Sequence, residues 1–348
     1  MSYKFQFNCL KFSFIGAFLL LFQLVNAQSF NDSELSSLLT SKQKQLGGNF
    51  VAVITNADTS IYKKEAGDVH STKTVLPIGD CSQLITAMLV MKFVEEGKIS
   101  LDDKIATYIP SFARYNKNYI TIRHCLSHYT GIKQEKAGSR YAKKFKSLEE
   151  LADHFASREI DYNAGEAFSY GLAGPNIAGR VLEVVGKRKF EVLVKQYLLS
   201  PLGMRRTNFN NTDFSAVRPA DGANSSAEDM AILVRVLLNK GTYKGKQVLS
   251  SESVDELFKI HTTSGVIKTA SRLTEGMPYT LAGWGNTTTN DSAASISLFD
   301  FEGNTLTIDM CKQYGYVSLV KEPQRLEGAI VTKEIKAITD KEFKSQCP

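Results

Sequence analysis

The stretch "VLPIGDCSQLITAMLVMKFVEEGKISLDD", residues 75–103, decides the prediction of the fold. After Gly79 the run from Leu84 to Met91 is apolar on nearly every side of a helix, which predicts a helix buried inside the protein. The first turn of that helix is polar, with Asp80, Cys81, Ser82 and Gln83. A polar cluster at this place either caps the helix or acts on a substrate, so it is the first candidate site.

The composition is that of an ordinary globular protein. The chain has 348 residues, of which 43% are hydrophobic and 22% are charged, so it can form one large core or two closely packed lobes. Its formal charge is +6, but the basic residues are scattered among acidic ones. This distribution argues against a nucleic-acid partner.

Residues 1–27 have the pattern of a cleavable secretory signal. A basic start precedes the apolar stretch from Phe12 to Val25, and the small residue Ala27 precedes the expected cut. The apolar stretch is too short to favour a membrane span, which needs about 20 residues. We therefore expect no membrane span and a secreted or periplasmic location for residues 28–348.

Four cysteines remain after the expected cut, and their pairing cannot be predicted. They are too sparse for a disulfide scaffold, and their spacing excludes a C-x-x-C metal or redox site. At least one disulfide and buried free thiols both stay open as alternatives. The four residues are Cys81, Cys125, Cys311 and Cys347.

The order of elements predicts strands at both ends of the chain and helices between them. A helix over 31–45 precedes a β-hairpin with its turn at 56–58, and strands return after Pro278 before a last helix. Within the helical middle, Thr121 and Gly131 bound one predicted helix, and the capping box Ser225-x-x-Glu228 begins another that ends at Gly241.

Strands from both ends can share one sheet if the helical middle is inserted between them. We therefore expect an α/β lobe from about 46–100 and 245–348 and a helical lobe at about 101–244. A cleft between two such lobes is a common place for a ligand.

Several segments together resemble the serine β-lactamase family. They are "VEEGKISLDDKIATYIPSF", "ITIRHCLSHYTGI", "AGEAFSYGLAGPNIAGRVLEVVG", "SPLGMRRTNF" and "DGANSSAEDMAILVRVLLNKG", in the order of that family and within residues 49–320. The resemblance is closest to the class C β-lactamases and the related esterases and penicillin-binding D,D-peptidases. It implies an α/β fold in which helices flank an antiparallel sheet and a mainly helical lobe is inserted.

The family's chemistry needs residues that this chain lacks. In the family, a serine opens the buried helix and a lysine three positions later helps to deprotonate it, so that the serine attacks an amide or ester carbonyl. Here Asp80 stands at the serine position and Gln83 at the lysine position. Tyr170 matches the tyrosine of the Tyr-x-Asn motif, but Leu172 replaces its asparagine. The third motif, Lys-Thr-Gly or His-x-Gly, is absent, and 297–300 is the best match for its strand.

These substitutions favour a structural role for the polar turn. Aspartate is a good N-cap, and a glutamine three residues later can reach back to the cap, so Asp80-x-x-Gln83 predicts a capping box worth about 1 kcal/mol. Asp80 as a nucleophile and Cys81 as a reactive thiol are the alternatives. His124 and His128 have the spacing of metal ligands on one helix face, but they lack a third ligand, so packing is favoured and no metal or cofactor is expected.

The sequence thus leads to three hypotheses about function. The first is a secreted, catalytically inactive relative with a binding or accessory role, whose partner is a small molecule, a glycan or peptidoglycan fragment, or a protein. The alternative is an active hydrolase of lactams, esters or D-Ala peptides with a rearranged site. The third is a structural protein whose cleft is filled by side chains.

Overall fold

The computed structural model describes ten segments of the chain, and they form an antiparallel sheet flanked by helices. Residues 31–348 form one compact unit by their internal contacts, whereas the predicted signal segment lies outside the described residues. Within the described segments, no helix is long and apolar enough to cross a membrane. The segments are 30–69, 71–134, 144–211, 213, 215–262, 267–269, 274–289, 291–300, 303–322 and 325–347.

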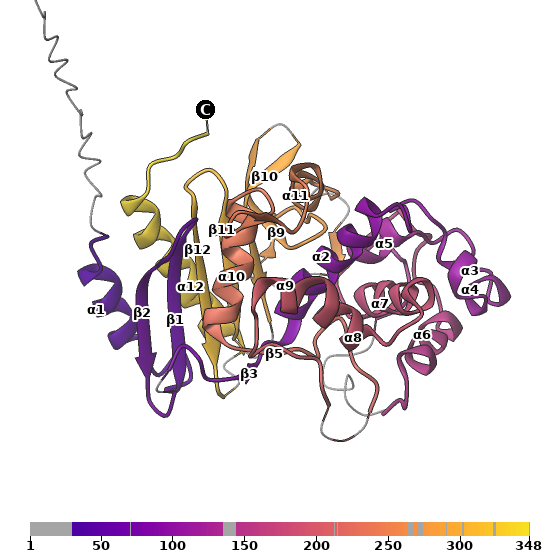
Figure 1. Cartoon of the computed structure of the whole chain (residues 1–348), viewed down its shortest axis with the longest axis horizontal. Coiled ribbons are helices and arrows are strands. Elements are labelled where there is room, and N and C mark those ends of the chain that lie inside the picture. The colour runs from indigo at the N-terminus through magenta and orange to yellow at the C-terminus, as the bar shows by residue number, and fades with distance from the viewer. Residues whose placement is uncertain are drawn as a thin grey trace, which may run out of the picture. The chain divides into compact units, whose positions relative to one another are not determined.

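The sheet has six strands in the order β2-β1-β12-β11-β10-β9, which joins the two ends of the chain (Figure 1). Every pairing is antiparallel, and Val53 of β1 lies opposite Val317 of β12. The predicted hairpin and the return of strands near the C-terminus are therefore confirmed. The strands are β1 (Phe50–Asn56), β2 (Ser60–Ala66), β9 (Trp284–Thr289), β10 (Ser292–Phe299), β11 (Thr305–Asp309) and β12 (Tyr314–Val320).

Helices cover both faces of this sheet. Gly315 of β12 lies against Val234 of α10 (Ala227–Leu238), because a Cβ on that glycine would approach the valine side chain to 2.3 Å. The neighbouring Tyr314 donates a hydrogen bond of 2.7 Å to Asp340 of α12 (Arg325–Glu342). Since successive side chains of a strand point to opposite faces, α10 and α12 pack on opposite sides of the sheet. Although α10 falls within the segment expected for the helical lobe, it packs on β1, β11 and β12.

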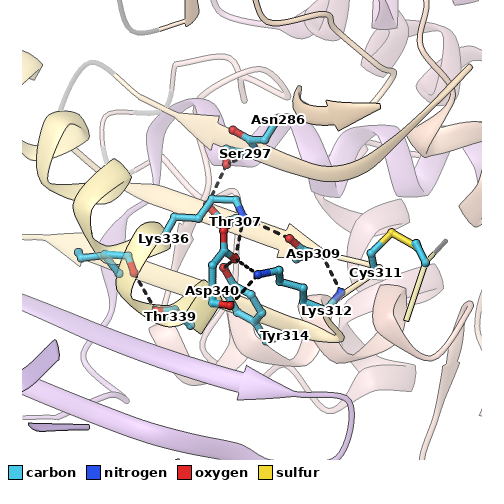
Figure 2. A network of polar contacts seen from close by, with 12 residues as sticks. Asn286, Ser297, Thr307, Asp309, Cys311, Lys312, Tyr314, Lys336, Thr339 and Asp340 are labelled. Atoms are coloured by element: carbon cyan, nitrogen blue, oxygen red, sulfur yellow. Dashed lines mark hydrogen bonds and ion pairs between the residues drawn. A yellow bond between two sulfur atoms is a disulfide. The ribbon is translucent and has the colours of Figure 1, made fainter. Parts of the chain in front are cut away.

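A polar network and a disulfide hold the C-terminal helix and tail to the sheet (Figure 2). Lys336 contacts Asp309 at 3.2 Å and Asp340 at 2.9 Å, and Asp340 accepts the hydrogen bond from β12. Beyond α12, Cys347 forms a disulfide with Cys311 at the end of β11. The other two cysteines of the described chain, Cys81 and Cys125, are buried free thiols.

The segment between the two groups of strands is mainly helical, as predicted. Three two-stranded pairs tie its loops together: β3 with β5, β6 with β7, and β4 with β8, the last of them parallel. The α1 helix (Ser33–Ser41), which precedes the sheet, packs against α12. The remaining elements are β3 (Leu76–Pro77), α3 (Ile105–Tyr108), α4 (Ser111–Arg114), α5 (Ile122–Leu126), α6 (Leu148–Ser157), β4 (Phe168–Ser169), α7 (Ala173–Gly186), α8 (Phe190–Val194), η2 (Lys195–Leu199), α9 (Ser200–Leu202), β5 (Asn224–Ser225), β6 (Thr242–Tyr243), β7 (Lys246–Gln247), α11 (Ser251–Phe258) and β8 (Ile267–Thr269).

Two predicted helix boundaries are wrong, and tertiary contacts explain one of them. Thr121 caps α5 as predicted, but the helix ends at Leu126 instead of Gly131. The N-cap of α10 is Ser226, one residue beyond the predicted capping box, and its hydroxyl accepts from the amide of Asp229 at 3.2 Å. Ser225 is unavailable for capping because it pairs in β5 and its hydroxyl bonds to Thr207.

Candidate functional site

The polar turn of the opening stretch forms η1 (Gly79–Cys81), a 3₁₀ turn that continues into α2 (Ser82–Glu95). Gly79 has a φ of +49°, and a Cβ there would lie 2.0 Å from a carboxylate oxygen of Asp300. Only glycine combines this backbone conformation with so close a neighbour. Because Asp300 directly follows β10, the end of the strand aligned with the family's third motif lies beside the helix start.

The predicted capping box at Asp80 and Gln83 is wrong. The N-cap of α2 is Cys81 and that of η1 is Ile78, and neither position has a side-chain cap. The reason is that the chain begins to turn at Gly79, so Asp80 already lies within helical structure. Its carboxylate instead accepts a hydrogen bond of 3.1 Å from the hydroxyl of Tyr170, so Tyr170 faces Asp80.

The contact between Asp80 and Tyr170 is part of a larger hydrogen-bonded network of polar side chains. The Tyr170 hydroxyl accepts from the amide nitrogen of Gln83 at 3.2 Å. The amide oxygen of Gln83 lies 3.2 Å from Nε2 of His128 and 3.5 Å from the hydroxyl of Tyr279. Since Nδ1 of His128 accepts from the amide of Gly171 at 3.4 Å, Nε2 is the nitrogen that carries the proton. Gln83 thus connects Tyr170 to His128 and Tyr279.

Aromatic rings pack against the side chains of this network. Trp284 at the start of β9 packs against Phe168, Tyr170 and Tyr279 with ring centroids 5.1 to 5.5 Å apart. The imidazole of His128 lies 4.6 Å from the ring of Tyr170 and 4.8 Å from that of Tyr279. The rings come from segments far apart in sequence, so the site depends on the docking of the helical segment against the sheet.

Most of the cluster is withdrawn from solvent. Asp80, His128 and Tyr279 are each 2% exposed and Gln83 is 4% exposed, whereas Tyr170 is only partly buried. Burial lowers the pKa of His128 to about 3, so its imidazole is neutral near pH 7. Burial also raises the pKa of Tyr279, which keeps that hydroxyl protonated. Neither group has a pKa suited to general-base catalysis near neutral pH.

The Ser82 hydroxyl and the Cys81 thiol of the turn have structural roles. The Ser82 hydroxyl donates to the carbonyl of Gly79 at 2.6 Å and accepts from the amide of Ala223 at 3.0 Å. Cys81 is fully buried, and burial raises the pKa of its thiol well above the ordinary value, helped by the nearby carboxylates of Asp300 and Asp80. A neutral, inaccessible thiol is a poor nucleophile.

Leu172, which we predicted at the asparagine position of the Tyr-x-Asn motif, is the N-cap residue of α7 and offers no polar side-chain atom. The nearest amide on that helix, Asn176, is buried and its oxygen accepts from the backbone of Ala220 at 3.1 Å. No amide of the first turn of α7 therefore takes over the lost position.

The two histidines with metal-like spacing separate in the structure. His124 belongs to the cap of α5, where its side chain accepts from the amide of Thr121 at 3.3 Å. His128 lies beyond the helix end with a φ of +59°, so the two rings do not share a helix face. Among the residues that the structure describes, no three His, Cys, Asp or Glu side chains form a group that could hold a metal ion.

Three members of the cluster were not identified from the sequence as site residues. His128 was assigned to packing, and Tyr279 and Trp284 were seen only as parts of a strand-rich segment. A usable signal was the aromatic content of "PYTLAGWG" beside the segment aligned with the third motif. For His128, only tertiary structure shows that it reaches Gln83.

Comparisons with known proteins give a consistent result. The family model described as Beta-lactamase matches residues 34–326. "Protein flp" of Staphylococcus aureus strain MW2 is 24% identical over 156 residues, which cover 44% of this chain and 31% of that protein. The "N-acetylmuramyl-L-alanine amidase" of Bacillus subtilis strain 168 is 22% identical over 242 residues, or 53% of this chain and 54% of the relative. The chain therefore matches about a third to a half of the length of these two relatives.

Solved structures show the same fold. EstCE1, titled a hydrolase with promiscuous acyltransferase activity, has a TM-score of 0.74 at 18% identity, covering 88% of this chain and 99% of its own. The octameric penicillin-binding protein homologue from Pyrococcus abyssi has a TM-score of 0.71 at 18% identity, covering 89% of this chain and 78% of its own. At such identities the likeness establishes the architecture and not the activity.

Proposed function

We propose that this chain, which belongs to the Beta-lactamase family, is a secreted member that has lost hydrolytic activity and has a binding or accessory role. The observation that carries the proposal is the hydrogen-bonded chain from Asp80 through Tyr170 and Gln83 to His128 and Tyr279. Asp80 and Gln83, at the positions of the catalytic serine and lysine, both belong to this hydrogen-bonded network. Neither side chain can perform the family's serine acylation.

The chemistry of the cluster supports the loss of activity. An acyl-enzyme needs a nucleophile activated by a base. Asp80 accepts a hydrogen bond from Tyr170, which stabilises its carboxylate and lowers its nucleophilicity, and Gln83 cannot act as a base. Removing the nucleophile alone from a serine hydrolase reduces kcat by about 10⁶, and further losses in the same unit add little.

Two features support export. Residues 1–27 have the pattern of a cleavable signal, and Cys311 forms a disulfide with Cys347. Disulfides persist mainly in oxidising compartments such as the periplasm or the extracellular space. Expression of the full chain with its signal, followed by fractionation and N-terminal sequencing, tests this part, and an intact N-terminus in the cytoplasm would contradict it.

Labelling with acylating probes tests the loss of activity. The mature protein is incubated with a fluorophosphonate and with a fluorescent penicillin, beside an active serine β-lactamase as positive control. We expect no adduct on this protein, because both probes require an activated serine in the cleft. A stoichiometric adduct, mapped by mass spectrometry to a cluster residue, would overturn the proposal.

Turnover assays separate the inactive protein from a hydrolase with a rearranged site. A chromogenic lactam, a p-nitrophenyl ester and a D-Ala-D-Ala peptide are offered to the wild type and to Tyr170→Phe. We expect both proteins to match the buffer background. Turnover by the wild type that disappears in Tyr170→Phe would establish the hydrolase instead.

A further inference from the structure

A cleft lies on the helical part of the molecule, and no residue of the Asp80 cluster lines it. It has a volume of about 720 Å³, and its walls come from the start of α6, the second half of α7, the connection to α8, residues 210–211 and residues 215–217. We propose that this cleft binds a small anionic ligand that also carries hydroxyl groups, of the class of a phosphorylated or carboxylated sugar.

The cleft is separate from the candidate site, so the proposal does not rest on the proposed function. Helix α7 begins at Ala173, three residues after Tyr170, while the cleft is lined by Arg180, Glu183 and Lys187. At 1.5 Å per residue, the cleft end of the helix lies about 20 Å from its start. No residue of the Asp80 cluster lines the cleft.

One part of the cleft lining carries unpaired positive charge. Lys187, Arg188 and Lys189 follow one another at the end of α7 and are all exposed, and Lys146 lines the cleft from the start of α6. The left-handed backbone of Lys187, with a φ of +51°, ends the helix and begins the turn into α8. None of these four cations forms an ion pair with a carboxylate of the described residues. An anion can therefore bind them without displacing an existing partner.

Two residues that line the cleft, Arg180 and Glu191, carry buried polar atoms without a hydrogen-bond partner in the described chain. Arg180 pairs with Glu149 at 2.9 Å and with Glu183 at 3.0 Å, but its buried Nε has no hydrogen-bond partner. The buried Oε2 of Glu191 has none either. Unsatisfied buried groups destabilise a protein, so a ligand that supplies their partners binds more tightly. Arg180 requires an acceptor, whereas Glu191 requires a donor.

These two requirements define the ligand class. An anionic group satisfies the cations at the end of α7 and provides acceptors for Arg180, and a hydroxyl group provides the donor for Glu191. A plain anion such as sulfate satisfies the cations and Arg180 but offers no hydrogen-bond donor to Glu191. A neutral sugar supplies only the hydroxyl groups. A sugar that bears a phosphate or a carboxylate satisfies both, and binding measurements distinguish these two sources of charge.

Isothermal titration calorimetry of the mature protein tests the proposal with four probes: glucose 6-phosphate, glucuronate, sulfate and methyl glucoside. We expect at least one charged sugar to bind about tenfold or more tightly than methyl glucoside and more tightly than sulfate. The charged sugar with the higher affinity shows whether the site prefers a phosphate or a carboxylate. Absence of binding by both charged sugars, or equal binding of methyl glucoside, would overturn the proposal.

Matched variants locate the binding. The triple variant K187Q/R188Q/K189Q removes the charged run, and K73Q/K244Q/K246Q removes the same net charge from three exposed lysines outside the cleft. The control shares the backbone strain, because Lys244 also has a positive φ, at +48°. We expect affinity for the charged sugar to fall about tenfold in the first variant and to stay within about twofold in the second. An equal fall in both would show a nonspecific charge effect and refute the site.

A substitution of Glu191 tests the hydroxyl contact. Glu191→Leu removes the orphan acceptor while it keeps a side chain of similar size. We expect the substitution to weaken the binding of glucose 6-phosphate or glucuronate relative to the binding of sulfate. Uniform strengthening of all anions, as expected from the loss of one negative charge alone, would contradict the role assigned to Glu191.

Discussion

Replacing Tyr170 by phenylalanine tests whether the Asp80 cluster stabilises the fold. The substitution keeps the aromatic ring, with its contacts to His128 and Trp284, and removes a single hydroxyl. That hydroxyl donates to Asp80 at 3.1 Å and accepts from Gln83 at 3.2 Å. Both partners are almost fully buried, so they regain little solvent when the hydroxyl is lost.

The size of the effect follows from these two bonds. A hydrogen bond to a charged group contributes about 1.5–3 kcal/mol, and one between neutral groups about 0.5–1.5 kcal/mol. Tyr170 is itself only partly buried, which allows water to replace part of the loss. We therefore expect Tyr170→Phe to lower the free energy of unfolding by about 2 kcal/mol.

Equilibrium denaturation in urea, at pH 7.5, provides the measurement. The same substitution in an Asp80→Ala background should cost only about 1 kcal/mol, because the carboxylate partner is already absent. The difference gives a coupling of about 1 kcal/mol between the two side chains. Tyr129→Phe is the matched control, since Tyr129 packs in the same aromatic cluster and its hydroxyl has no hydrogen bond within the described residues. It should cost less than about 0.5 kcal/mol.

A different outcome would refute the reasoning. If Tyr170→Phe costs no more than the Tyr129 control and shows no coupling to Asp80, the cluster does not stabilise the fold. The hydroxyl would then be retained for another purpose, and a hydrolase with a rearranged site would become the better explanation. A variant that is more stable than the wild type would lead to the same conclusion, because catalytic groups are often held at a cost to stability.

Three further results are expected. The pKa of His128 is about 3 in the folded protein and about 6.5 in the unfolded chain. The contribution of the neutral imidazole to stability is therefore full above pH 6.5 and is lost as the pH falls. Between pH 7.5 and 5, the wild type should lose about 2 kcal/mol more of its free energy of unfolding in urea than His128→Asn. Cys347→Ser opens a disulfide that spans 36 residues and should lower stability by about 3–4 kcal/mol, and a reductant should destabilise the wild type but not the variant. Gly79→Ala should lower stability in thermal unfolding by at least about 2 kcal/mol, and the control Gly97→Ala by about 1 kcal/mol. Both glycines have a positive φ, but of the two only Gly79 has a neighbour that the new Cβ would meet. Equal costs would show that the close approach is relieved without strain.

Local sequence patterns determined most of the architecture. Alternation of apolar and polar residues predicted the hairpin of β1 and β2, and the continuous apolar run after Gly79 predicted the buried helix α2. The order of the motifs led to the β-lactamase fold. The alignment of Asp80 and Gln83 with the family's serine and lysine is likewise a prediction from the sequence alone.

The contacts of those two residues were decided only by tertiary structure. The capping box was a sound local prediction, but the positive φ of Gly79 starts the turn earlier and directs the Asp80 carboxylate to Tyr170. Gln83 meets His128, 45 residues away, and Tyr279, 196 residues away. Spacing along the chain encodes neighbours within a helix or strand, whereas partners on separate segments become adjacent only when the apolar faces of those segments are buried together.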